Sequence, residues 1–283
     1  MTSAADIKLL DGFERALLNG RLTMVYQPKV ALADGQLIRV EALVRWEDPA
    51  MGPVAPSRFV PLAERHGLID QLTQWGLRTT LRQWLNWRAQ GLDTAIAFNI
   101  SALSLQHLDF PDLVERMCRA LDVPTDRLVL ELTEGATQPL IKLMDTLTRF
   151  RIKGIGLAID DFGTGYSSLM QLRQLPFTDV KIDRLFVSDM CRSNDSRVIV
   201  KAIIDLAHGL GLTATAEGVE TAEQLTLLRE MGCDTAQGFL IAQPLPAGEL
   251  VGWNSRHKRR WKMLVSPPAD PHLRRRVEAN ALR

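Results

Sequence analysis

Carboxylate side chains follow a short apolar run of the sequence and could bind a cation. The run 157–159 ends in Asp160 and Asp161, and Gly163 and Gly165 follow closely. Two adjacent carboxylates at the end of a strand repel each other unless a cation lies between them or one is protonated. A solvated acidic turn would explain a single pair of this kind. The other apolar runs therefore decide between a turn and a cation site.

Most of the other apolar runs also carry an oxygen-bearing side chain near one end. The set is Glu41, Asn99, Glu131, Asp160, Asp161 and Glu217. Because an unpaired carboxylate is costly to bury, several of them on strands favour a shared site over chance. Oxygen ligands without His or Cys favour Mg²⁺ or Mn²⁺ over zinc. The set predicts a site where two such ions could share an aspartate and hold a phosphodiester.

Lys181 belongs to the same group of positions and has two interpretations. It could be only an ion-pair partner that lowers the negative charge of the acids. Alternatively, it could orient an attacking water or exchange a proton with it. A third reading makes the chain a lyase whose Lys181 forms a Schiff base with a carbonyl substrate. A lysine among acids keeps its proton, however, and is then a poor nucleophile.

Eight short β-rich runs would position these side chains. They are 22–26, 37–44, 95–100, 128–132, 156–159, 180–182, 214–216 and 236–240. Stretches with helical spacing separate most of the runs, which predicts a mostly parallel sheet. The first connection, 28–36, is too short for a helix and contains Asp34-Gly35, so the first two strands should form an antiparallel hairpin. The expected fold is α/β, a modified (β/α)₈ TIM-type barrel with the first strand antiparallel.

The sequence predicts one domain and a tail. Residues 1–253 should form the barrel, with a short helix at about 7–18 and a long loop at 48–61. Residues 254–283 hold nine Lys and Arg against two acidic residues, a net charge of +7, which leaves −6 for residues 1–253. We expect residues 254–283 to be a basic, flexible tail without a packed core.

Composition limits the class of protein. No apolar run approaches the ~20 residues of a membrane helix, and the N-terminus lacks the pattern of a secretory signal. Cys118, Cys191 and Cys233 are widely spaced, which favours free thiols in a reducing compartment. We therefore expect a cytoplasmic protein without a transmembrane segment. The acidic balance of residues 1–253 makes nucleic acid an unlikely partner.

Eight motifs, in order, resemble the EAL domain family, the cyclic di-GMP phosphodiesterases of bacterial signalling. The signature is Glu41-Ala42-Leu43, followed by Val44-Arg45-Trp46. The others are YQP at 26–28, NIS at 99–101, ELTE at 131–134, DDFGTGYSS at 160–168, KID at 181–183, AEGVET at 216–221 and QGF at 237–239. The resemblance covers roughly residues 7–252. It departs from the family at Phe239, where tyrosine is common, and at Gln243, where Arg or Lys is common.

The resemblance implies a role for each matching position. The metal positions are Glu41, Asn99, Glu131, Asp160, Asp161 and Glu217, and the catalytic ones are Glu217 as general base, Lys181 beside the attacking water, and Glu41. The substrate positions are Gln27, Leu43, Arg45, Asp183, Glu220 and Gln237. Arg45 suits a phosphate because its guanidinium donates two parallel hydrogen bonds. Glu134 matches a glutamate that stabilises the loop after Asp161, and that loop and the next helix often form a homodimer contact.

The activity that the resemblance implies is hydrolysis of cyclic di-GMP to linear pGpG, with two Mg²⁺ or Mn²⁺ ions per active site. The alternative is a non-catalytic receptor that binds cyclic di-GMP and signals to a protein partner. The complete set of acidic positions favours the enzyme.

Overall fold

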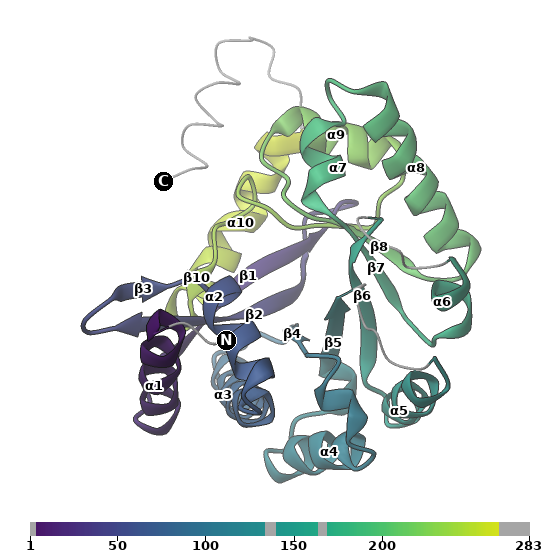
Figure 1. The fold of residues 1–283 in the computed structure, drawn as a ribbon. Coiled ribbons are helices and arrows are strands. Elements are labelled where there is room, and N and C mark those ends of the chain that lie inside the picture. Colours follow the sequence, from purple (N-terminus) through teal and green to yellow (C-terminus); the bar gives the residue numbers. More distant parts are fainter. Residues whose placement is uncertain (1–3, 134–139, 164–168, 266–283) are drawn as a thin grey trace.

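The computed structural model describes residues 4–133, 140–163 and 169–265, and it is a barrel surrounded by helices (Figure 1). The strands of the barrel are β1 (Leu22–Ala31), β2 (Leu37–Asp48), β4 (Ala95–Asn99), β5 (Leu128–Thr133), β6 (Gly156–Phe162), β7 (Asp179–Ile182), β8 (Thr213–Ala216) and β9 (Thr235–Ala236). They follow the order β1-β9-β8-β7-β6-β5-β4-β2, and the pairing of β1 with β2 closes the ring. β1 is antiparallel to β2 and β9, and the other neighbours in the ring are parallel. The expected barrel with a reversed first strand is therefore confirmed.

Helices cover the outside of the barrel. They are α1 (Ala4–Leu18), α2 (Pro56–Arg65), α3 (Ile69–Ala89), α4 (Phe110–Ala120), α5 (Leu140–Ile152), α6 (Leu169–Gln174), α7 (Arg184–Asp189), α8 (Asn194–Gly209), α9 (Ala222–Glu230) and α10 (Leu250–Val265). Three short 3₁₀ turns lie at Ser104–Gln106, Thr125–Arg127 and Ala247–Glu249. None of the described helices is long and apolar enough to cross a membrane.

The segment 48–61 is not the long loop that its prolines and glycines suggested. It contains the short strand β3 (Gly52–Val54), which pairs with the end of β2, and the first turns of α2. α2 begins at Pro56. Proline is favourable at the first position of a helix because a backbone N–H there would have no acceptor within the helix. A second short strand, β10 (Leu245–Pro246), pairs with β1.

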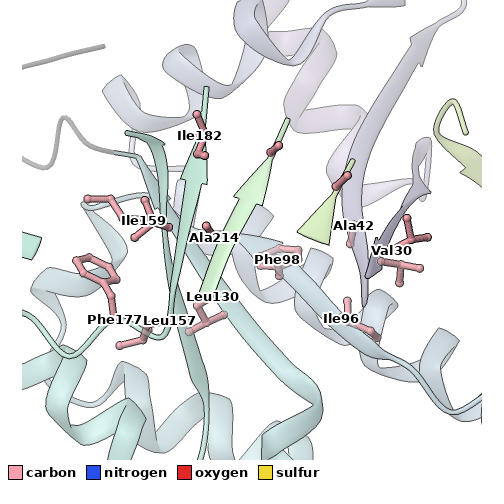
Figure 2. Close-up of a cluster of buried hydrophobic side chains, with 14 of the residues drawn as sticks. Val30, Ala42, Ile96, Phe98, Leu130, Leu157, Ile159, Phe177, Ile182 and Ala214 are labelled. Carbon is pink, nitrogen blue, oxygen red and sulfur yellow. The ribbon is translucent and has the colours of Figure 1, made fainter. Parts of the chain in front are cut away.

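The alternation of side chains along the strands separates two environments. Successive residues of a strand point to opposite faces of the sheet. One set, which includes Val40, Ala42 and Ile96, is apolar and buried in a cluster with helix side chains such as Trp84 and Trp87. Figure 2 shows members of this set on several strands. The other set faces the interior of the barrel, where it carries most of the charged residues described below.

α10 extends the packed fold beyond the boundary that we expected at residue 253. Trp253, His257 and Trp261 are spaced four residues apart, so they share one face of the helix, and all three are buried. The ring of Trp261 lies over Gly35 in the hairpin between β1 and β2, where an added Cβ would come within 2.1 Å of it. The segment 254–264 is therefore part of the fold and not a flexible tail. Its buried His257 and Trp261 pack against the barrel, although most of its other residues are basic or polar. Residues 266–283 lie outside the described residues.

Candidate functional site

Lys181 on β7 lies at the centre of the charged interior. Its Nζ is 2.8 Å from Glu131 Oε2, 2.9 Å from Asp160 Oδ1 and 2.7 Å from Glu217 Oε1. Glu41 Oε2 is slightly farther away, at 3.9 Å. The structure thus brings together acids from β2, β5, β6 and the segment after β8. The Lys181 side chain is 1% exposed, so these charges act on one another with little screening by water.

The acids around Lys181 keep it protonated. Burial by itself would lower the pKa of Lys181, but the surrounding carboxylates hold that pKa well above its ordinary value. A Schiff-base lyase needs a neutral amine, so this arrangement disfavours the lyase alternative.

Both oxygens of Glu41 accept hydrogen bonds from carboxamides. Asn99 Nδ2 donates to Oε1 at 2.7 Å, and Gln237 Nε2 donates to Oε2 at 2.6 Å. The same Gln237 nitrogen lies 2.9 Å from Gln27 Oε1, and Gln27 is the residue opposite Glu41 in the pairing of β1 with β2. Gln27 Nε2 in turn donates to the carbonyl of Ala242 at 3.1 Å. Gln237, expected to bind substrate, therefore holds Glu41 in this structure, and Gln27, expected to do the same, holds Gln237.

Glu131 is held by two lysines, and one of them was missed in the sequence. Lys29 Nζ lies 2.8 Å from Glu131 Oε1, and its side chain is 1% exposed. Burial would raise the pKa of Glu131, but the charges of Lys181 and Lys29 lower it to about 2. The expected first strand, 22–26, ended three residues before Lys29. β1 instead continues to Ala31, and the two-residue spacing from Gln27 to Lys29 would have placed Lys29 on the interior face.

Asp160, Asp161 and Glu217 form a cluster that suits a metal ion. One carboxylate oxygen from each lies within 4.8 Å of the other two. Adjacent residues of a strand normally face opposite ways, but the pairing of β6 with β7 shifts between Ile159 and Phe162, and Asp161 has a left-handed φ of 53°. Such a bulge turns neighbouring side chains toward the same region. Three carboxylates without His or Cys are the donors that hard divalent cations prefer.

The pKa values of this cluster show the cost of crowding carboxylates without a cation. Burial and the charge of Asp160 raise the pKa of Asp161 to about 6, with a further contribution from Asp183. Burial raises the pKa of Glu217 to about 8, with Asp160 and Glu41 adding to the rise and Lys181 opposing it. A bound divalent cation would stabilise both groups in the ionised form.

We expect the metal-free protein to lose stability as the pH rises from about 4.5 to about 8. Both pKa values are raised in the folded state, so in this window the folded protein binds more protons than the unfolded chain. The free energy of unfolding must then fall with rising pH. Two groups act in the opposite direction. Glu131, whose pKa is lowered to about 2, does so only at more acidic pH, and His257, whose pKa burial lowers from 6.5 to about 4, does so below about pH 6.5. The fall in stability is therefore clearest between about pH 6.5 and pH 8, where Glu217 carries it. Thermal unfolding in a chelator between pH 5 and pH 8.5 measures the slope.

Two further samples make this measurement specific. Glu217→Gln should flatten the pH dependence, and excess Mg²⁺ should flatten it in the unchanged protein. A melting temperature in chelator that stays level or rises over this range contradicts the expectation.

A cavity of about 560 Å³ reaches Asn99, the hydrogen-bond partner of Glu41, and has the size of a small-molecule site. Leu43, Arg45 and Asn99 line it, together with apolar residues such as Phe98. Arg45 is half-buried, and its Nη1 donates to the carbonyl of Val44 at 2.8 Å. A polar part of the wall that we did not single out is Ser101, whose hydroxyl donates to Glu64 Oε1 at 2.7 Å.

The remaining expected site residues lie elsewhere or outside the described parts. Asp183 caps α7, its Oδ1 accepting from the backbone N–H of Leu185 at 2.7 Å, and it also interacts with Asp161. Glu220 is exposed, at the start of α9. Neither residue lines the 560 Å³ cavity. Glu134 and residues 164–168 of the loop after Asp161 lie outside the described residues.

Fold and site together define a barrel of the TIM type with carboxylates and two lysines in its interior. The family model described as "EAL domain" matches residues 11–244, and the chain belongs to this family. The match includes every residue of the charged interior described above and ends before α10.

Curated relatives show the same likeness. The bifunctional diguanylate cyclase/cyclic di-GMP phosphodiesterase MucR of Pseudomonas aeruginosa is 41% identical over 87% of this chain and 36% of its own length. The cyclic di-GMP phosphodiesterase NbdA of the same organism is 40% identical over 87% of this chain and 32% of its own length. The chain thus spans about a third of the length of these relatives.

Solved structures agree with the fold. The MucR phosphodiesterase in its complex with c-di-GMP is 41% identical and has a TM-score of 0.82, covering 86% of this chain and 99% of that chain. The EAL enzyme Bd1971, in a form bound to cAMP and cyclic di-GMP, is 30% identical with a TM-score of 0.84, covering 89% of this chain and 69% of that chain.

Proposed function

We propose that this chain hydrolyses cyclic di-GMP, opening one phosphodiester to give linear pGpG. The observation that carries the proposal is the group of acids around Lys181 in a member of the EAL domain family. Glu41 of this group is hydrogen-bonded to Asn99, which lines a cavity together with Arg45. The identity to MucR, whose solved complex contains c-di-GMP, supports the same substrate.

The chain's own residues account for binding of the substrate and for the proton. Arg45 can donate two hydrogen bonds to a phosphate oxygen, and Leu43 supplies an apolar contact in the same cavity. Glu217 can accept a proton from the attacking water once a bound divalent cation keeps its carboxylate ionised. Lys181, 2.7 Å from Glu217, holds that carboxylate in place. As the water oxygen bonds to phosphorus, the P–O bond to the 3′ oxygen breaks, and that oxygen leaves and takes up a proton.

The proposed cofactor is a pair of Mg²⁺ or Mn²⁺ ions. Asp160, Asp161 and Glu217 would hold them, together with Glu41, Asn99 and Glu131. When bound, such ions neutralise developing charge on the phosphate and lower the pKa of water.

The test is an assay of the purified chain with cyclic di-GMP and either Mg²⁺ or Mn²⁺, with the products separated by chromatography. We expect linear pGpG to accumulate, and chelator to stop its formation. Saturable binding of cyclic di-GMP without turnover in either metal would contradict the proposed hydrolysis and support the alternative, a non-catalytic receptor.

We also propose a homodimer through α6, the helix that follows the loop after Asp161. Leu169 and Met170 on this helix are 64% and 52% exposed, which is unusual for two adjacent large apolar side chains. Leu169→Glu should raise the dimer dissociation constant about ten-fold or more, because it places a charge in an apolar contact. Sedimentation velocity over a range of concentrations measures the effect.

The matched control for the dimer is Leu18→Glu, which changes another exposed leucine, at the end of α1 (Leu18 is 80% exposed). This control should leave the dissociation constant unchanged. A monomeric wild-type chain at high concentration, or equal effects of the two substitutions, contradicts the proposed contact.

A further inference from the structure

A groove on the outside of the barrel gathers three positive charges that the catalytic site does not use. It lies between α3 and α4, which contact each other and run side by side at the bottom of Figure 1. The groove has a volume of about 280 Å³. Its lining is Arg78, Arg82, Arg116, Met117, Ala120 and Leu121.

The three arginines differ from the other arginines of this region. Arg119 pairs with Glu115 at 3.1 Å, Arg127 pairs with Asp93 at 2.8 Å, and Arg88 lies over the ring of Trp84 at 5.2 Å. Within the described parts of the chain, by contrast, Arg78, Arg82 and Arg116 form no ion pair and no side-chain hydrogen bond.

The three arginines are exposed and carry like charges close together. Arg78 and Arg82 are one helical turn apart on α3, so they face the same side and repel each other. Arg116 adds a third positive charge from α4. The acid next to it in the chain, Glu115, is already engaged by Lys153 at 2.6 Å and by Arg119. A ligand with several negative charges would remove this repulsion.

The floor of the groove adds an apolar requirement. Met117 and Leu121 are half-buried there, and methionine adapts its shape to a partner. Guanidinium groups around an apolar floor suit carboxylates that flank apolar side chains, as on an amphipathic peptide in a groove between helices. A long polyanion such as nucleic acid fits less well, since the groove offers only three arginines and an apolar floor.

We propose that the groove between α3 and α4 is a docking site for an acidic, amphipathic segment of a protein partner. Arg78, Arg82 and Arg116 bind its carboxylates, and Met117 and Leu121 contact its apolar side chains. The site lies on the outer helices, so its occupation does not depend on turnover of cyclic di-GMP.

The experiment uses the full chain and a fluorescein-labelled helical peptide of Glu and Leu, with leucines on one face. A second peptide replaces every Glu by Gln. We expect saturable binding of the Glu peptide by fluorescence anisotropy, weakening with salt, and no comparable binding of the Gln peptide. The triple variant Arg78→Ala/Arg82→Ala/Arg116→Ala should lose about ten-fold or more in affinity, because charge-assisted hydrogen bonds are lost.

A control variant removes the same net charge elsewhere. Arg21, Arg58 and Arg192 are exposed on other parts of the chain, and their triple replacement by alanine should leave the affinity within about two-fold. Thermal unfolding checks that both triple variants are folded. Three outcomes overturn the proposal: no saturable binding of the Glu peptide, an equal loss in both triple variants, or full displacement of the peptide by millimolar inorganic phosphate, which would indicate a small-anion site instead.

Discussion

Replacing Asp160 by alanine should reduce hydrolysis of cyclic di-GMP by about 100-fold or more while the barrel stays folded. Asp160 contacts Lys181 at 2.9 Å and belongs to the carboxylate cluster that suits a metal ion. Its loss removes a proposed ligand, and it also relieves repulsion on Asp161 and Glu217. We therefore expect turnover to fall and the pH dependence of stability to become weaker. Turnover is measured by chromatography of pGpG, and stability by thermal unfolding in chelator.

Asp205→Ala is the matched control for this substitution. Asp205 is an exposed acid of the outer helix α8, where it pairs with Lys201 of the same helix. Its replacement should change neither turnover nor the pH slope. If Asp160→Ala retains turnover within about ten-fold of the unchanged chain in both metals, the proposed metal site is wrong.

Replacing Lys29 by methionine should lower the free energy of unfolding by about 3 kcal/mol, because it leaves a buried carboxylate oxygen without its partner. Lys29 and Glu131 are 1% and 0% exposed, and their atoms lie 2.8 Å apart. Methionine preserves most of the volume, so the loss reports the charge and not a cavity. Urea unfolding measures the change. Turnover should also fall, because Glu131 then has only Lys181 to fix its orientation.

A double variant separates the ion pair from other effects of the substitution. Lys29→Met with Glu131→Gln removes both charges, so part of the stability lost in Lys29→Met alone should return. Arg119→Ala, which breaks the exposed pair with Glu115, is the control and should cost at most about 1 kcal/mol. A loss in Lys29→Met no larger than in this control contradicts a buried ion pair.

Much of the fold could be predicted because its signals are local. Seven of the eight β-rich runs lie on strands, and the eighth, 236–240, overlaps the short strand β9 only at Ala236. The Asp34-Gly35 turn connects the expected antiparallel hairpin. The gathering of Glu41, Glu131, Asp160 and Glu217 follows from strand ends that meet on one side of a barrel. The hydrogen-bond and ion-pair partners of each carboxylate do not follow from the sequence, because they depend on how the side chains of different strands pack together.

The residues that sequence reasoning missed depend on signals that compete. The apolar run 22–26 ended the expected first strand before Lys29, although pairing with β2 carries β1 to Ala31. The basic residues after Trp253 indicated a tail, although Trp261 packs on the hairpin at Gly35. In both places a contact between segments far apart in the sequence overrides the local pattern. No local rule supplies such a contact.

The alternation of side chains along the strands has a consequence for how the gene can change. Glu41 faces the charged interior, while its neighbours Val40 and Ala42 are buried among the apolar side chains outside the barrel wall. One inserted or deleted codon inside β2 would reverse these destinations for every later residue of the strand. Length changes within the strands should therefore remove stability and activity together. Single-residue insertions and deletions in the connecting loops do not change the direction of strand side chains. We therefore expect length variation among descendants of this chain to lie mainly in those loops.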